Sequence, residues 1–223
     1  MVQAHGLSLS YGSTAALTDV SLTLRAGESV ALMGPSGSGK SSLLHCLAGV
    51  LVPGSGEVTV AGAALHAMPE RRRSQHRLAH LGMVFQFGNM VPELTLLENV
   101  MLPLQLLGRP AREARALAAG ELDRLGVAEV ADRRAGAVSG GQAQRAAVAR
   151  ALVHRPPVLF ADEPTGALDS VSADHVLDAL LRAADELGSA LLVVTHENRV
   201  AAHCDRLMSM RDGRVSAPQA ALS

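Results

Sequence analysis

A chain of 223 residues, 48% of them hydrophobic, is long enough for one large α/β domain with a full core and short for two independent domains. Its formal net charge of −1 argues against a protein that relies on a basic surface to hold nucleic acid. Two cysteines, Cys46 and Cys204, are too few for a disulfide framework, so buried reduced thiols and a cytosolic location are expected.

The first elements of the chain are predicted to be strands. Residues 2–10 and 17–24 alternate apolar and polar side chains, as half-buried strands do, with a turn at residues 11–13 between them. The first five residues, 1–5, lack a basic segment followed by an apolar one, so no signal peptide is expected. Tyr11, the single tyrosine, has two interpretations: a turn residue packed by its neighbours, or a ring stacked on a planar ligand.

Residues 25–28 are predicted to form a hairpin turn into a buried strand at residues 29–33, which leads into a glycine-rich loop. The loop contains Gly34, Pro35, Ser36, Gly37, Ser38, Gly39, Lys40 and Ser41, and Ser42 continues into a predicted helix. The pattern G-x-x-x-x-G-K-[ST] between a strand and a helix is typical of a phosphate-binding loop. In such a loop the backbone N–H groups are expected to surround an anion, Lys40 (the chain's single lysine) to reach the outer phosphates, and the Ser41 hydroxyl can ligate Mg²⁺.

Residues 53–56 are predicted to turn into a strand at 57–61, so the first third of the chain forms a mainly antiparallel sheet beside a nucleotide-binding core. Residues 68–80 carry four arginines, which we interpret as a solvated helix face because no aromatic side chains interleave the charges as in a nucleic-acid site. A strand at residues 81–85 follows and ends at Gln86.

Helices are predicted over residues 95–107, 110–125 and 140–154, where Leu and Ala recur with few β-branched residues. This part, residues 88–155, is expected to form a helical subdomain. The most apolar region, residues 91–107, is interrupted by prolines and glutamates and falls short of the roughly 20 apolar residues of a membrane span. The chain is therefore expected to be soluble, or attached to a membrane only through another protein.

The α/β pattern returns in the last third. A strand at residues 157–161, a helix at 170–187, a strand at 190–195 and a strand at 206–210 are predicted. Residues 217–223 are expected to form a flexible tail.

Polar residues directly follow the strands of the predicted core: the phosphate loop, Gln86, then Asp162 with Glu163, then His196. Ligands bind at the carboxyl ends of strands in an open parallel sheet, so these residues are expected to meet at one nucleotide. Asp162 is suited to Mg²⁺ together with Ser41, Glu163 to deprotonating an attacking water, and His196 to a γ-phosphate. The simpler alternatives are a solvated strand end for the acidic pair and a core position for the histidine.

A second candidate anion site opens the helix predicted at residues 140–154. It consists of Ser139, Gly140, Gly141 and Gln142. The serine can cap the helix, and the free N–H groups at that end favour an anion. Two phosphate sites in one chain, separated by helical sequence, suit a two-fold dimer in which each site completes the nucleotide site of the other subunit.

Together these motifs resemble the nucleotide-binding subunits of ATP-binding cassette (ABC) transporters over nearly the whole chain. The corresponding segments are Walker A at residues 34–41, the Q-loop at Gln86, the signature at 138–142, Walker B at 158–162, the D-loop at 166–169 and the switch histidine His196. The resemblance implies one domain over residues 1–223: an α/β, P-loop NTPase (RecA-like) core with an antiparallel β subdomain and an inserted α-helical subdomain.

The resemblance also implies ATP and Mg²⁺ as cofactors and a head-to-tail dimer around ATP. The signature Ser139 and Gly141 would reach the γ-phosphate bound by a second copy, and Tyr11 would stack on adenine. The implied catalytic residues are Lys40, Gln86, Glu163 and His196; the implied metal ligands are Ser41, Gln86 and Asp162; and Asp169 joins the nucleotide-binding residues.

Residues 85–100 and 161–166 are most similar to the lipoprotein-release and macrolide-efflux group, whose subunits pair with four-span permeases. A permease docked near residues 86–100 would place the protein on the inner face of the cell membrane. Val138, where leucine is usual, and Gly88 with Asn89, where bulkier residues are usual, depart from the pattern. The alternative function is a non-transport ATP-driven clamp or a cell-division-type regulatory ATPase.

Overall fold

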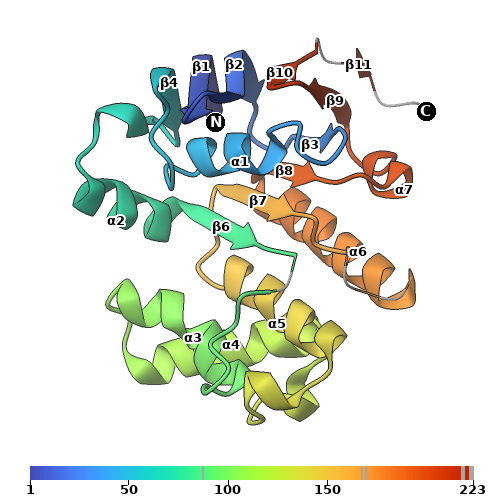
Figure 1. Ribbon diagram of the computed structural model, residues 1–223. Coiled ribbons are helices and arrows are strands. Elements are labelled where there is room, and N and C mark those ends of the chain that lie inside the picture. The colour runs from blue at the N-terminus through green and yellow to red at the C-terminus, as the bar shows by residue number, and fades with distance from the viewer. Residues whose placement is uncertain (87, 167, 169, 217–218, 221–223) are drawn as a thin grey trace.

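The computed structural model describes residues 1–86, 88–166, 168, 170–216 and 219–220, with the side chains at 170, 171, 219 and 220 not described. An antiparallel sheet lies at one end of the molecule, with the strand order β2-β1-β4-β5 (Figure 1). Its strands are β1 (Val2–Tyr11), β2 (Thr14–Leu24), β4 (Ser55–Val60) and β5 (Ala63–Ala64). This confirms the predicted antiparallel β subdomain.

A second sheet forms the centre of the molecule, with the strand order β10-β9-β3-β8-β7-β6. The strands are β3 (Ser29–Met33), β6 (Leu81–Val84), β7 (Val158–Asp162), β8 (Ala190–Val194), β9 (Arg206–Arg211) and β10 (Arg214–Val215). Strands β6, β7, β8, β3 and β9 are mutually parallel. Their carboxyl ends therefore lie at one edge of the sheet, as predicted from the polar residues that follow the strands.

The prediction of a hairpin at residues 25–28 is wrong. A turn is present there, with the N–H of Glu28 donating to the carbonyl of Arg25 at 3.3 Å, but β2 and β3 belong to different sheets. Strand β3 lies between β8 and β9. Its continuous apolar run is typical of a parallel strand buried on both faces, whereas β2 alternates because only one face is buried.

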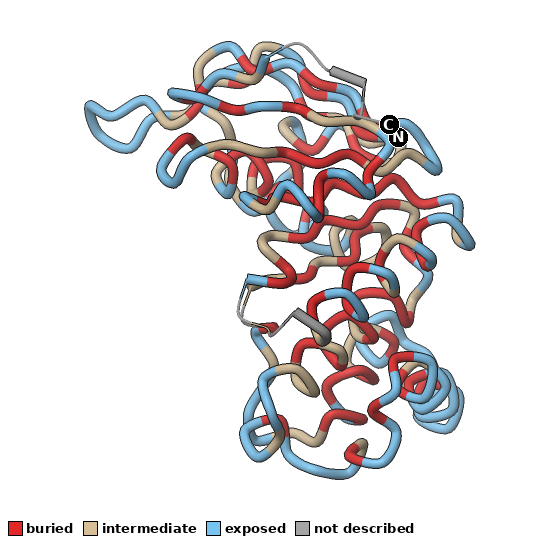
Figure 2. The backbone as a smooth tube through the Cα atoms, turned by 90° about the vertical axis from the view of Figure 1, so that its right-hand side faces the viewer, coloured by how far each residue is buried: buried red, intermediate tan, exposed pale blue. Residues whose placement is uncertain are grey.

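Alternate residues of the central strands face two different layers. Val30 and Leu32 belong to the core shared with the antiparallel sheet and helix α1 (Lys40–Leu47). Ala31 belongs to the core shared with the helical part of the chain and with α6 (Ser170–Leu187). Helices thus cover both faces of the sheet, and the strands β3, β7 and β8 between them are almost wholly buried. Buried residues also run through the helical part (Figure 2).

The helical part lies below the sheet in Figure 1 and contains α3 (Leu96–Leu106), α4 (Ala111–Arg124) and α5 (Gly140–Leu152). Helix α3 begins with a capping box: Thr95 Oγ1 accepts from the N–H of Glu98 at 3.1 Å, and Glu98 Oε2 accepts from the N–H of Thr95 at 2.8 Å. Two further helices, α2 (Glu70–His80) and α7 (Asn198–Ala201), flank the sheet.

The shorter elements are the 3₁₀ turns at Leu65–Ala67, Ala128–Val130 and Ala135–Ala137 and strand β11 (Gln219–Ala220), which pairs with β9. Of the expected tail, residues 217–218 and 221–223 lie outside the described residues. Cys46 and Cys204 are both buried and free, and burial raises their thiol pKa values to about 11 and about 12. No helix in the described part of the chain is both long and apolar enough to cross a membrane.

Candidate nucleotide site

The loop between β3 and α1 has a backbone that depends on glycine. Gly37 and Gly39 have φ values of 78° and 104°, in the region that L-residues with a Cβ rarely adopt. A Cβ at Gly39 would also collide with the carbonyl oxygen of Ala16 in β2, and one at Gly34 with that of Met210 in β9. The loop is thus folded tightly against neighbouring strands, with helix α1 starting immediately behind it at Lys40.

Lys40 lies inside this loop, with 8% of its surface exposed. Its ammonium group donates hydrogen bonds to the carbonyls of Gly34 at 2.8 Å and Pro35 at 2.9 Å. A pocket of about 400 Å³ opens over the loop, lined by Tyr11, Thr14, Ala15, Ala16, Ser36, Gly37, Gly39, Lys40, Ser41, Ser42 and Glu163. Tyr11 is 55% exposed at this pocket, which argues against a ring packed by its neighbours.

Asp162, the last residue of β7, lies next to the start of α1. Burial raises the pKa of its carboxyl group, and a hydrogen bond with the Ser41 side chain opposes that shift. The two side chains therefore present a carboxylate and a hydroxyl oxygen together, which is the kind of donor that Mg²⁺ prefers.

Glu163 follows with a left-handed backbone, at φ 47°, that turns its side chain toward the same pocket. Its N–H donates to the carbonyl of Val194 at 2.9 Å, at the end of the neighbouring strand β8. The Oε1 atom of Glu163 lies 3.3 Å from Nδ1 of His196, whose side chain is 63% exposed. His196 is therefore not a core histidine, and it faces the acidic residue predicted to act with it.

The side chain of Gln86 lies near the loop that follows β7, which carries Glu163. A Cβ at Gly166 would lie 3.1 Å from Gln86 Nε2 and 3.5 Å from Glu163 Oε2. The structure thus brings Gln86, Asp162, Glu163 and His196 to one edge of the sheet, beside the phosphate loop.

The second predicted anion site lies apart from the first. Ser139 caps α5 with a complete capping box: its Oγ accepts from the N–H of Gln142 at 3.3 Å, and Gln142 Oε1 accepts from the N–H of Ser139 at 3.1 Å. This end of α5 lies in the helical part, far from α1 in Figure 1. Gly141 lies close to α6, because a Cβ added at Gly141 would be 3.2 Å from Ser172 Oγ. Asp169 lies outside the described residues.

Residues 17–166 match the family model described as ABC transporter. The chain belongs to the ABC transporter family. It is 48% identical over 198 residues to the lipoprotein-releasing system ATP-binding protein LolD of Paramagnetospirillum magneticum, covering 88% of this chain and 87% of that protein. It is 43% identical to an uncharacterized ABC transporter ATP-binding protein, YbbA, of Escherichia coli (strain K12), covering 96% of both chains.

Solved structures agree with this assignment. A dimeric, post-hydrolysis state of the ATP-binding cassette MJ0796 bound to ADP and Pi has a TM-score of 0.93 at 35% identity, with all of both chains covered. A second dimeric structure of the MJ0796 cassette has a TM-score of 0.94 at the same identity and coverage. These likenesses confirm the predicted P-loop NTPase core with its antiparallel and helical subdomains, and the protein is an ATP-binding subunit of the ABC family.

Two side chains of this ABC cassette that the sequence analysis did not single out hold the site loops to the helical part. Gln144 on α5, 3% exposed, donates from Nε2 to the carbonyls of Phe85 and Pro164, both at 2.9 Å. Arg150 on the same helix donates to the carbonyls of Gly88 at 2.7 Å and Asn89 at 2.9 Å. In the sequence, the only indication of these contacts was that Gln144 and Arg150 are polar residues among the small apolar residues of a predicted helix.

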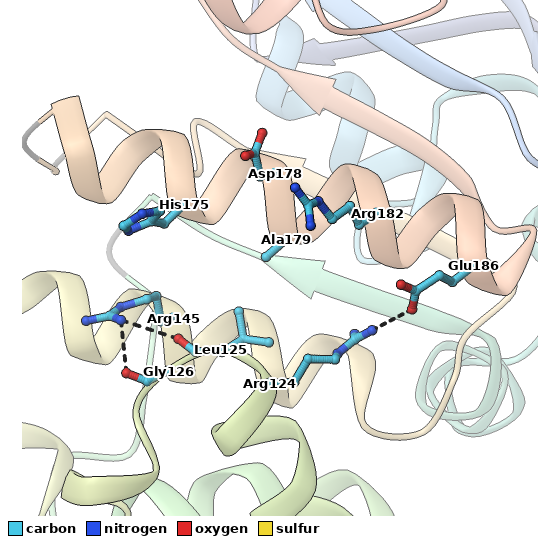
Figure 3. Close-up of a pocket in the computed structure, with 9 residues that line it drawn as sticks. All are labelled: Arg124, Leu125, Gly126, Arg145, His175, Asp178, Ala179, Arg182 and Glu186. Atoms are coloured by element: carbon cyan, nitrogen blue, oxygen red, sulfur yellow. Dashed lines mark hydrogen bonds and ion pairs between the residues drawn. The ribbon is translucent and has the colours of Figure 1, made fainter.

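Another pocket of the cassette, of about 450 Å³, lies between α4, α5 and α6 and contains none of the predicted site residues (Figure 3). Arg145 closes one side by donating to the carbonyls of Gly126 at 3.0 Å and Leu125 at 3.4 Å, at the C-terminal end of α4. On the other side Arg124 pairs with Glu186 of α6 at 2.8 Å. Arg145, Arg124 and Glu186 thus link α4 to the two neighbouring helices across this pocket.

Proposed function

We propose that the protein is a Mg²⁺-dependent ATPase that dimerises head to tail on ATP and drives a four-span permease in lipoprotein release, export or mechanical coupling. In this proposal residues 1–223 form one nucleotide-binding domain with a helical subdomain at about residues 88–155. The observation that carries it is the meeting of Asp162, Glu163 and His196 with Lys40 and Ser41 at one edge of the sheet. The similarity to LolD supports the choice of partner.

ATP would occupy the pocket over the phosphate loop. Tyr11 lines that pocket and is 55% exposed, which fits a ring that stacks on adenine. Lys40 would exchange the carbonyls of Gly34 and Pro35 for phosphate oxygens, while backbone N–H groups surround the phosphates. The residues proposed to bind ATP in this way are Tyr11, Gly34, Pro35, Ser36, Gly37, Ser38, Gly39, Lys40, Ser41 and Ser42.

The oxygen donors at the start of α1 and the end of β7 fit Mg²⁺, which commonly takes one or two protein ligands together with phosphates and waters. Ser41 and Asp162 would hold the ion, and Gln86 would join them from its loop. When bound, Mg²⁺ neutralises part of the phosphate charge.

Glu163 is proposed to orient a water molecule and to take its proton onto the carboxylate as the water attacks the γ-phosphate. Its anchored N–H and left-handed backbone aim the carboxylate at the pocket. His196 would donate a hydrogen bond to the γ-phosphate from its exposed ring, next to Glu163. Both side chains thus act at the end of the nucleotide that Lys40 binds.

The signature residues are proposed to serve a second copy of the chain. Ser139, Gly140, Gly141 and Gln142 start α5 far from the phosphate loop of their own chain, and the capping box leaves the first N–H groups of the helix available to an anion. The two MJ0796 cassette structures are dimers, which supports the same arrangement for this chain. Asp169 would contribute to the same interface.

The permease is proposed to dock near residues 86–100, next to a groove of about 250 Å³ between α2, β6, α3 and α5. Leu78, Leu81, Met83, Phe85 and Pro103 supply its apolar walls, and Arg77, Arg150 and His154 its polar ones. Val91, Leu106 and Leu107 are exposed on the nearby segments. An apolar segment of the permease would cover these side chains and hold the cassette at the cytoplasmic face of the membrane.

Two variants test the nucleotide chemistry. Glu163→Gln keeps the shape of the side chain but cannot take a proton, so it should bind ATP, accumulate as a dimer in size-exclusion chromatography and release no phosphate. Lys40→Ala should lose tight ATP binding and stay monomeric. Undiminished ATP turnover by Glu163→Gln would refute the role given to that carboxylate.

The partner is tested by recovering tagged Glu163→Gln protein from detergent-solubilised membranes of its own cells and identifying co-purified proteins by mass spectrometry. Recovery of a four-span permease with a large extracytoplasmic domain is the expected result. Recovery of soluble partners alone, from cells that express the permease, would favour an ATP-driven clamp.

A further inference from the structure

The segments that follow β7 and β8 are joined on both sides of the Glu163 and His196 pair. On one side the N–H of Glu163 donates to the carbonyl of Val194 at 2.9 Å. On the other side the hydroxyl of Thr165 donates to Glu197 Oε1, also at 2.9 Å. Glu163 and His196 therefore lie on two loops that are linked by one backbone and one side-chain hydrogen bond; we call these two linked loops the frame.

Strand pairing does not extend into this frame. The parallel register of β7 with β8 ends at Asp162 opposite Val194. Packing does not hold the histidine either, because the side chain of His196 is 63% exposed. The separation of His196 from Glu163 thus depends on links between the two loops beyond the strand ends.

The Thr165 to Glu197 link is well placed to supply that rigidity. Thr165 is only 2% exposed, so its hydroxyl has little access to water as an alternative partner. Glu197 is fixed in turn, because its N–H donates to Thr195 Oγ1 at 3.0 Å. Arg199 lies 3.7 Å from the Glu197 carboxylate and pairs with Asp174 of α6 at 2.7 Å, which ties the same loop to that helix.

We propose that Thr165 and Glu197 are positioning residues whose hydrogen bond holds His196 against Glu163 for ATP hydrolysis. This rests on the proposed function, in which those two residues act on the γ-phosphate and the attacking water. Neither Thr165 nor Glu197 is proposed to contact the nucleotide. Losing their hydrogen bond lets the two loops separate, and displacements of about 1 Å at a catalytic group cost up to about 100-fold in rate.

Three variants separate the hydrogen bond from charge and shape. Thr165→Val keeps the volume but removes the hydroxyl, Glu197→Ala removes the acceptor, and Glu197→Gln keeps an acceptor oxygen. In steady-state phosphate release, kcat should fall about tenfold for the first two, with KM for ATP changed less than about twofold. Glu197→Gln should keep most of the wild-type kcat, and the Thr165→Val, Glu197→Ala double variant should be no slower than either single one.

Ser29→Ala is the matched control. It removes another hydroxyl-to-carboxylate hydrogen bond, from Ser29 Oγ to Asp205 Oδ2 at 2.7 Å, at the opposite end of β3 from the phosphate loop. Its kcat should match the wild type, while its Tm reports what losing such a bond does to stability alone.

Wild-type kcat in Thr165→Val would overturn the proposal, as would a Glu197→Gln variant as slow as Glu197→Ala or additive losses in the double variant. Glu163→Gln, measured in parallel, distinguishes this failure from failure of the proposed function. If Glu163→Gln is inactive and Thr165→Val is fully active, only the proposed positioning role of Thr165 and Glu197 is refuted. If Glu163→Gln is fully active, the proposed catalytic role of Glu163 is refuted as well.

Discussion

The buried amide of Gln144 attaches helix α5 to two loops of the nucleotide site, and replacing it tests how strongly that attachment contributes to stability. Gln144→Met keeps the length and volume of the side chain but removes the donor. The bond to the Pro164 carbonyl is buried, and the bond to the Phe85 carbonyl is partly buried. A buried acceptor left without a donor costs about 1–3 kcal/mol and a partly buried one less, so the free energy of unfolding should fall by about 2–4 kcal/mol.

Urea unfolding followed by circular dichroism measures this loss. With a slope of about 1–3 kcal/mol per M, the midpoint should fall by at least about 0.7 M while the slope itself stays unchanged. Gln105→Met, at an exposed position of α3, is the control and should change the free energy of unfolding by no more than about 0.5 kcal/mol. Equal midpoints for the two variants would show that the Gln144 hydrogen bonds contribute nothing net, and the reasoning would fail.

Three further substitutions test local features. Gly39→Ala should lose clearly more stability than Gly37→Ala in urea unfolding, because the new Cβ at position 39 meets the carbonyl of Ala16. A Cβ at position 37 meets no atom within 4 Å, so an alanine there costs only about 1–2 kcal/mol of left-handed backbone strain. Equal losses for the two variants would contradict this reasoning. Thr95→Ala should lower the free energy of unfolding by about 1 kcal/mol by removing the capping box of α3, and wild-type stability would show that the cap is unimportant. Burial lowers the pKa of His154 below its ordinary value of 6.5, so the unfolded chain takes up the proton first and stability should fall as the pH drops below about 6.5. His154→Gln should lose less stability between pH 7.5 and pH 5.5, and an unchanged pH dependence would contradict a neutral, partly buried histidine at this position.

Local signals in the sequence predicted several elements closely. The helix predicted at residues 170–187 coincides with α6 (Ser170–Leu187), and the one predicted at residues 140–154 overlaps α5 (Gly140–Leu152). The serine or threonine before α5 and α3 and the Gln or Glu three residues later are capping-box patterns, which depend only on neighbours within one turn. Helix α7 (Asn198–Ala201) was missed, because a single turn of helix has too little periodicity to detect.

The turn at residues 25–28 shows what local patterns leave out. Glycine and polar residues there predict a turn correctly, but they do not say whether the following strand pairs with the preceding one. Strand β3 pairs instead with β8 and β9, more than 150 residues further along the chain. Burial on both faces decided this pairing, and it is a property of the whole sheet.

By itself the sequence determined which chemical groups follow each core strand: the glycine-rich loop with Lys40 and Ser41, then Asp162 with Glu163, then His196. Only the tertiary structure decided that β3, β8 and β7 are neighbours, and hence that Glu163 Oε1 lies 3.3 Å from His196 Nδ1. The same holds for Gln144, whose acceptor at Phe85 is 59 residues away. Such contacts join residues that are distant in sequence, and only the packing of the strands and helices against one another brings them within hydrogen-bonding distance.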